Sequence, residues 1–163
     1  MSVEDNLRTT EAHIRAEDAR DLDGILATFA EDCVYEDSLL DAPVRGKPAV
    51  AAYYRELWAA FPDFRFEVTN RVASDDSVVY EMTFRGTQSG TFRGIPATGR
   101  PGELKAVVVF PMANGRALGE RVYIDAVSYL TQAGLLPPRE SILVRAWFDL
   151  VALWLRVLKL LHL

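Results

Sequence analysis

Side chains that commonly bind metals or form covalent bonds are scarce in this chain of 163 residues, which has one cysteine, Cys33, and two histidines, His13 and His162. A single cysteine excludes an intrachain disulfide and any metal cluster built on cysteines. Because the apolar Val34 follows it and no histidine is near in sequence, we expect Cys33 to be a buried strand residue rather than a nucleophile. The two histidines are far apart and have no carboxylate arranged for a metal three or four residues away, so we predict no metal site.

Positive charge is also limited, since 18 Lys and Arg stand against 23 Asp and Glu and the net charge is −5. This balance argues against a protein that binds nucleic acid, which would need a basic face for phosphates. The acidic N-terminus has no apolar segment typical of a secretory signal, and we therefore expect a cytoplasmic protein. No glycine-rich phosphate loop is present, because GTFRGIPATGR does not stand between a strand and a helix with a lysine.

Hydrophobic periodicity and turn residues predict an α+β domain in which helices cover one side of a sheet. Asp21 is suited to cap a second, short helix, and Pro48 to stand in the first turn of a third. A helix that crosses a strongly curved antiparallel sheet would leave a conical cavity. The predicted helices are 3–20, 22–29, 48–61 and 128–132, and the predicted strands are 33–35, 64–68, 78–85, 104–112 (buried on both faces) and 119–126.

Two parts of the chain resemble one superfamily, the nuclear-transport-factor-2-like cone fold. GTFRGIPATGR and the later ERVYIDAVSYLTQAGLL are similar to SnoaL-like polyketide cyclases, whereas DLDGILATFAEDCVYED and RGKPAVAAYY resemble ketosteroid isomerases. The resemblance implies a cone domain over residues 1–136. It also implies a cofactor-free enzyme or binding protein with a pocket for a hydrophobic small molecule, and a homodimer formed through the open sheet face.

The resemblance also indicates residues. In the cyclases an aspartate on the last strand is the general acid/base, and the matching residue is Asp125. In the isomerases an aspartate just after the first strand is the base, and Asp37 matches it. The position of the isomerase oxyanion-hole tyrosine is His13, and the second donor falls in Val107–Val109. Because the loss of one such donor reduces the rate by about two to three orders of magnitude, we do not expect a steroid isomerase of that type.

Each of these candidates also has a structural interpretation. We expect Asp125, between Ile124 and Ala126, to face the cone with a raised pKa; the alternative is an outward carboxylate paired with Arg121 or Arg116. Asp37 could serve as a base or cap a turn. His13 could donate a hydrogen bond to a ligand carbonyl from a neutral imidazole, or lie at the surface.

Aromatic residues predict what the pocket binds. Tyr54 and Trp58 share one face of the third helix, and a strand that faces it carries Tyr80 and Phe84. Ligand sites are mainly apolar with few polar groups, which favours a flat or polycyclic ligand with carbonyl or hydroxyl groups. The predicted ligand-binding residues are Tyr54, Trp58, Tyr80, Phe84, Phe110 and Tyr123.

After Pro137-Pro138, residues 137–163 form an extension that we predict to be an amphipathic helix. Its charged residues recur at helical spacing, with leucines and tryptophans opposite. The charges interrupt it too often for a transmembrane span. Three interpretations remain open: the helix packs on the domain or on a dimer partner, lies on a membrane surface through 142–163, or closes the cone as a lid.

Two functions of different classes follow. The first is a cofactor-independent cyclase or isomerase that uses Asp125 as acid/base on a polyketide-like or other hydrophobic carbonyl compound, with Tyr54, Tyr123 and His13 orienting it. The second is a non-catalytic module that binds a small ligand or a protein partner through the C-terminal helix. A hydrolase of the same fold would need an Asp–Arg–Asp set that the sequence does not supply. The orientation of Asp125 discriminates between the first two.

Overall fold

A computed structural model describes residues 2–39, 42–138 and 140–160 of the chain. The helices and strands, in order, are α1 (Val3–Asp18), α2 (Leu22–Thr28), β1 (Phe29–Asp37), β2 (Val44–Arg45), α3 (Lys47–Ala60), β3 (Arg65–Ala73), β4 (Ser77–Thr87), β5 (Pro101–Ala113), β6 (Arg116–Ile124), α4 (Ala126–Gln132) and α5 (Ile142–Leu160). The caps follow the sequence: the side chain of Asp21 accepts a hydrogen bond from the Gly24 N–H at 3.0 Å, and Pro48 lies in the first turn of α3.

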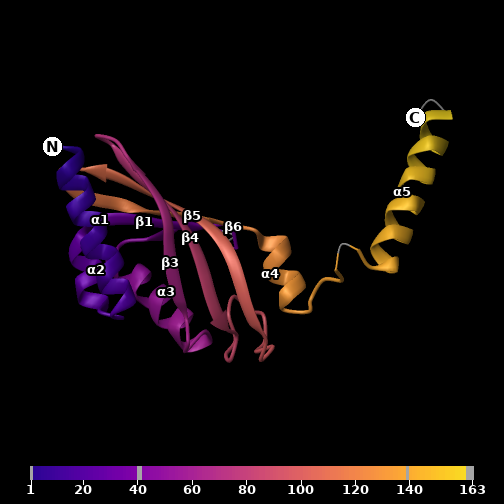
Figure 1. Ribbon diagram of the computed structural model, residues 1–163, viewed down its shortest axis with the longest axis horizontal. Helices are drawn as coiled ribbons and strands as arrows, with labels where there is room; N and C mark the ends of the chain where they lie inside the picture. Colours follow the sequence, from indigo (N-terminus) through magenta and orange to yellow (C-terminus); the bar gives the residue numbers. More distant parts are fainter. Residues whose placement is uncertain (1, 40–41, 139, 161–163) are drawn as a thin grey trace.

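The strands form one six-stranded sheet in the order β2-β1-β6-β5-β4-β3. The sheet is curved, and α1, α2 and α3 pack on one of its faces, as Figure 1 shows. This arrangement confirms the predicted α+β cone fold. One detail differs, because β1 runs parallel to β6 and the sheet is therefore mixed rather than purely antiparallel.

Burial alternates along the central strands because helices cover only one face of the sheet. On β4, Tyr80 and Met82 point into the core, as the sequence predicts. On β5, Val108 and Phe110 are buried, whereas Val107 on the other face is exposed. The prediction that 104–112 is buried on both faces is therefore wrong, because the apolar residues of this run alternate between the core face and the exposed face of the sheet.

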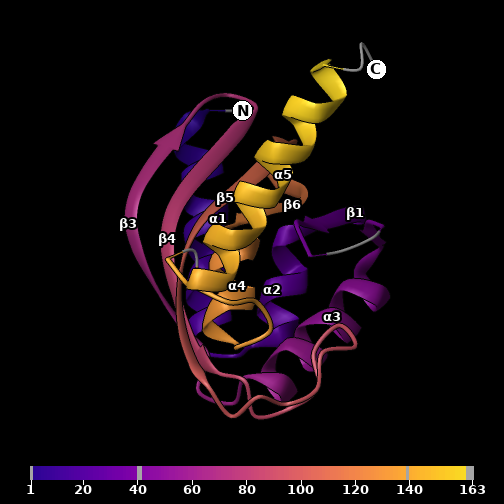
Figure 2. The same cartoon turned by 90° about the vertical axis from the view of Figure 1, so that its right-hand side faces the viewer.

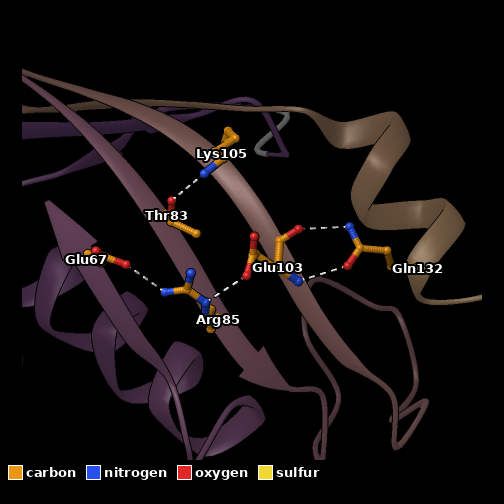
Figure 3. A network of polar contacts seen from close by, with 6 residues as sticks. All are labelled: Glu67, Thr83, Arg85, Glu103, Lys105 and Gln132. Carbon is orange, nitrogen blue, oxygen red and sulfur yellow. Dashed lines mark hydrogen bonds and ion pairs between the residues drawn. The ribbon is translucent and has the colours of Figure 1, made fainter. Parts of the chain in front are cut away.

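The last strand ends earlier than predicted. β6 stops at Ile124, and Asp125 is the N-cap of α4, where its Oδ1 accepts a hydrogen bond from the Ser128 N–H at 3.0 Å. Helix α4 follows the end of β6 at the open end of the cone (Figure 1), the end that faces the viewer in Figure 2. The side-chain amide of Gln132 bonds to the backbone N–H and C=O of Glu103 at 2.8 and 2.9 Å and thereby fastens α4 to β5 (Figure 3).

Helix α5 projects away from the rest of the chain (Figure 1). None of its described residues is buried, and Trp147 and Trp154 are 64% and 60% exposed. Residues 161–163, including His162, were predicted to continue this helix and lie outside the described residues. Among the helices that the structure describes, none is long and apolar enough to cross a membrane.

Candidate functional site

A cavity lies inside the cone, between α3, the concave face of the sheet, the loop 88–100 and α4. Its volume is about 100 Å³, several times what one water molecule needs. Its walls are mainly apolar. The apolar lining includes Leu57, Phe61, Phe64, Met82, Phe84, Phe92, Leu104, Val108, Val122 and Ile124, and the polar lining includes Glu17, Tyr35, Asp37, Tyr53, Tyr54, Arg85, Gln88, Arg100, Glu120 and Gln132.

Glu120 is the most deeply buried carboxylate of the cavity, with 3% of the residue exposed. Tyr54 Oη donates a hydrogen bond to Glu120 Oε2 at 2.8 Å. His13 Nε2 lies 3.7 Å from the same oxygen and 3.3 Å from Tyr54 Oη. Among the described residues none bonds to Oε1, and because Glu120 lines the cavity, this second oxygen is left for a ligand.

Hydrogen bonds fix the tautomer of His13. Thr28 Oγ1 is 2.6 Å from the carbonyl oxygen of Ile25, which can only accept, so the threonine hydrogen is committed there. The His13 Nδ1 atom, 2.8 Å from Thr28 Oγ1, must therefore carry a hydrogen and donate it. Nε2 is then left as an acceptor that faces Tyr54 and Glu120. Complete burial lowers the pKa of His13 to about 3, so the ring is neutral at physiological pH.

Burial has the opposite effect on the carboxylates. It raises the pKa of Glu120 to about 7, and the hydrogen bond from Tyr54 offsets part of this shift. The pKa of Glu17, on α1, is also raised well above its ordinary value, by burial and by the negative charges of Glu120 and Asp18. Two carboxyl groups so close in an apolar cavity resist being ionised together, so the pair retains a proton near neutral pH.

The same groups could hold a metal ion. One ligand atom each from His13, Glu17 and Glu120 lie within 4.8 Å of one another. A histidine with two carboxylates is a donor set found at zinc and other divalent sites, and Thr28 would orient the ring. Tyr54, however, is hydrogen-bonded to both His13 and Glu120, so a metal would have to displace it or bind its oxygen. The prediction that the protein has no metal site is therefore neither confirmed nor contradicted by this geometry.

A second polar group lies on the wall next to the first. Tyr35 Oη donates to Tyr53 Oη at 2.9 Å, and Tyr53 Oη donates to Asp37 Oδ2 at 2.8 Å. The backbone N–H of Leu39 donates to Asp37 Oδ1 at 2.5 Å. Burial raises the pKa of both tyrosines, so they remain protonated donors. The guanidinium of Arg93 lies over the Tyr53 ring, 4.8 Å from its centroid, and holds the ring in place.

Strand register brings the two groups together. On β1, Tyr35 and Asp37 share the face that points into the cone, and in the parallel pair they lie opposite Glu120 and Val122 of β6. The two strands approach closely at Gly119, which has a positive φ of 151° and where a Cβ would overlap the carbonyl of Val34. A glycine is therefore needed immediately before Glu120.

The structure brings together only some of the predicted site residues. Asp37, Tyr54 and Phe84 line the cavity. His13 lies behind Tyr54 in the core, and Trp58 packs on the Tyr54 ring at 5.5 Å.

The other four candidates are outside the cavity lining. Tyr80 and Phe110 are core residues that pack on each other. Tyr123 is 55% exposed on the open face of the sheet. Asp125 is exposed and caps α4, so the prediction that it faces the cone is wrong: the strand ends one residue before it, and the alternation points Glu120 and Val122 inward instead.

The sequence did not lead us to Glu17, Tyr35, Tyr53 or Glu120, although a signal existed for Glu17. Glu17 follows His13 by four residues and therefore lies on the same helical face, in contrast to the expectation that no carboxylate is so spaced. Asn6 and Thr10 precede His13 on that face, so α1 presents polar groups to the interior. The burial of Glu120 has no local signal, because it depends on the pairing of β6 with β1.

The chain is similar to proteins of known structure. The family model described as SnoaL-like polyketide cyclase matches residues 7–133. No curated protein matches the chain. A candidate SnoaL-like polyketide cyclase from Jannaschia sp. CCS1 is 24% identical with a TM-score of 0.74, over 83% of this chain and 94% of that one.

Two proteins from Streptomyces are also similar in structure. IdmH, a candidate polyketide cyclase from Streptomyces antibioticus, is 28% identical with a TM-score of 0.66, over 79% of this chain and 98% of that one. AclR, a candidate hydroxylase from Streptomyces galilaeus, is 23% identical with a TM-score of 0.74, over 95% of this chain and 97% of that one. Because 95% of the chain cannot be covered without residues of α5, the likeness to AclR extends into that helix.

Proposed function

The chain belongs to the SnoaL-like polyketide cyclase family, and we propose that it catalyses proton transfer on a hydrophobic carbonyl compound, as a cyclase or isomerase, with Glu120 as the acid/base. The observation that carries this proposal is the position of Glu120. It is a buried carboxylate whose pKa is raised to about 7, and one of its oxygens is open to an apolar cavity. A group that must take a proton and return it works best when its pKa is near the working pH.

In the proposed reaction, ionised Glu120 removes a proton from the carbon next to the ligand carbonyl. The electron pair of the broken C–H bond becomes an enolate, and its oxygen needs a hydrogen-bond donor. Glu17 supplies that donor in its protonated form, because its own pKa is raised well above the ordinary value. The enolate carbon then either attacks a second carbonyl of the same molecule, which closes a ring and leaves an alkoxide that takes the proton from Glu120, or another carbon of the enolate recovers that proton. Either way Glu120 ends the cycle ionised.

Tyr54 and His13 support both protonation states of Glu120. When Glu120 is ionised, the Tyr54 hydroxyl donates to it. When the open oxygen of Glu120 carries the ligand's proton, Tyr54 still donates to the other oxygen. If that other oxygen is protonated instead, it can donate to Tyr54, and Tyr54 can turn its hydrogen to the bare Nε2 of His13. All three groups then remain hydrogen-bonded, which lowers the cost of changing the charge in the cavity.

A direct test is hydrogen–deuterium exchange of 2-tetralone, a bicyclic ketone, followed by proton NMR in D₂O. We expect the protein to accelerate exchange next to the carbonyl, and Glu120→Gln to abolish the acceleration although it keeps the side-chain shape. Equal acceleration by the two proteins would contradict the proposal. Treatment with EDTA, followed by addition of Zn²⁺, determines whether the His13, Glu17 and Glu120 cluster needs a metal for this activity.

The non-catalytic alternative rests on a different observation. All the described residues of α5 are at least partly exposed, and many are large and apolar, which favours a surface that another molecule covers. We propose that residues 1–136 form the pocket domain and that 137–163 contact a second copy of the chain. Light scattering of the full chain and of a Trp147→Ser/Trp154→Ser variant tests this. A dimer that becomes a monomer supports it, and a wild-type monomer would contradict it and leave membrane contact to be tested with anionic vesicles.

A further inference from the structure

Two arginines line the outer part of the cavity, and they differ in their partners. Arg85, on β4, donates to Glu103 at 2.8 Å and to Glu67 at 3.2 Å, so two carboxylates from the neighbouring strands engage its guanidinium (Figure 3). Glu103 itself is held by Gln132 of α4. The charge of Arg85 is therefore balanced within the sheet, and this network fixes the edge of the cavity.

Arg100 is not engaged in this way. Within 2–39, 42–138 and 140–160 the structure gives its side chain no ion pair and no hydrogen bond. Its guanidinium lies against Gly134, just beyond α4, where an added Cβ would come within 2.6 Å of Arg100 Cζ. Gly134 has a positive φ of 78°, which suits glycine, and its lack of a side chain leaves room for the guanidinium at the mouth.

Arg100 and Glu120 lie toward opposite ends of the cavity. Arg100 immediately precedes β5, of which Pro101, Gly102, Leu104 and Val108 line the cavity. From Pro101 to Val108 the strand is roughly 23 Å long at ~3.3 Å per residue. Val108 pairs with Val122 of β6, two residues from Glu120. The wall between them carries Phe84, Leu104 and other apolar side chains. A ligand that fills this space is therefore elongated and apolar along its length.

Charge then sets which end of a ligand enters first. The inner part of the cavity holds the carboxyl groups of Glu17, Asp37 and Glu120, which disfavour an anion, whereas Arg100 at the mouth favours one. Guanidinium binds a carboxylate with two parallel hydrogen bonds, so it also fixes the orientation of the group it holds.

We propose that Arg100 binds a carboxylate of the ligand at the mouth, so that the substrate is an elongated, mainly apolar carbonyl compound with a carboxylate at the end away from the reacting carbonyl. The identity of the reacting end rests on the proposed function of Glu120. The binding of the carboxylate by Arg100 does not.

The test compares two probes, anthraquinone-2-carboxylate and its methyl ester, whose binding is followed by isothermal titration calorimetry. We expect the wild-type protein to bind the acid about tenfold more tightly than the ester, a preference that 0.5 M NaCl reduces. Arg100→Gln should remove the preference and leave ester binding unchanged, and Arg100→Lys should retain part of it. Arg55→Gln is the matched control, because Arg55 is exposed on α3, outside the cavity, and its loss changes the net charge equally.

Three results would overturn the inference: equal affinity of the wild-type protein for acid and ester, an equal loss of acid binding in Arg55→Gln, or an equal loss of both probes in Arg100→Gln. Failure of the proposed function gives a different pattern. In that case Glu120→Gln exchanges 2-tetralone as fast as the wild type, while the preference for the acid still depends on Arg100.

Discussion

Tyr53 and Tyr54 are neighbours on α3, yet each donates its hydroxyl to a carboxylate in a different setting. Asp37, the acceptor of Tyr53, has both oxygens engaged, because Leu39 donates its N–H to the second one. Glu120, the acceptor of Tyr54, has one oxygen engaged and one open to the cavity. The two groups lie side by side on β1 and β6, so the difference comes from their hydrogen bonds and burial rather than from residue type.

This difference separates a positioning role from a chemical one. A carboxylate with one donor on each oxygen, such as Asp37, is held in place from both sides, and neither oxygen is left without a partner. A buried carboxylate with one donor and a raised pKa can exchange a proton with a ligand near neutral pH. We therefore expect the Asp37 group to shape the wall of the cavity and the Glu120 group to perform the chemistry.

The largest effect is expected from removing each carboxylate in turn. Glu120→Gln should reduce the rate of 2-tetralone exchange by about 10³-fold, within the range of general acid–base catalysis. Asp37→Asn should reduce it by no more than about tenfold, since it disturbs only the placement of Tyr53. An equal loss of rate in both variants would show that the two groups act as one unit and would contradict their separate roles.

Protein stability gives the next effect. Because burial raises the pKa of Glu120 from 4.5 to about 7, the folded state favours the protonated form. Its stabilising contribution is complete below about pH 4.5 and is lost as the pH rises through 7, an effect of about 3 kcal/mol. Urea denaturation should therefore show Glu120→Gln gaining stability relative to the wild type between pH 5 and pH 8. Asp37→Asn, the control, replaces one acceptor oxygen by an NH2 group, loses the hydrogen bond from either Tyr53 or Leu39, and should be less stable at both pH values. A constant difference between wild type and Glu120→Gln over this range would contradict the raised pKa.

Substitution of the two tyrosines tests the same difference in a second way. The hydrogen bond from Tyr54 lowers the pKa of Glu120, so Tyr54→Phe should raise that pKa and move the pH–rate profile of exchange upward by about one unit. The rate at pH 7 should fall about fivefold, because the ionised fraction of Glu120 falls from about one half to about one tenth. Tyr53→Phe serves as the matched variant and should leave the midpoint of the profile in place. A shift of the same size in both variants would argue against separate roles.

The smallest effect concerns Asp125, the residue that the family resemblance indicated. Asp125→Ala removes the N-cap of α4 and should reduce the free energy of unfolding by about 1 kcal/mol. The exchange rate should stay within about twofold of the wild type, since the side chain is outside the cavity. A loss of exchange comparable to that of Glu120→Gln, with α4 still folded, would return the acid/base role to Asp125.

The fold could be predicted further from the sequence than the site could. Local signals place the helices well: Asp21 caps α2, Pro48 begins α3, and the alternation of Tyr80, Met82 and Phe84 identifies the inner face of β4. They also indicate that Tyr54 faces the interior. These signals depend on neighbours in the sequence, which a pattern can show.

The chemistry of the cavity depends on distant residues. Glu120 lies among apolar groups because β6 pairs in parallel with β1 at Gly119, and no local sequence pattern predicts that pairing. Asp125 looked buried because Ile124 and Ala126 flank it, but the strand ends just before it and the side chain caps a helix. Because the strand ends one residue before Asp125, the buried carboxylate of this strand is Glu120 and not Asp125.

The most direct measurement is the pKa of Glu120, by carbon NMR of protein labelled at the glutamate carboxyl carbons, with Glu120→Gln used to assign the signal. We expect a midpoint near 7 that moves when anthraquinone-2-carboxylate binds. A midpoint near 4.5, the ordinary value for a glutamate, with no response to the ligand, would contradict the claim that Glu120 is the acid/base of this cavity.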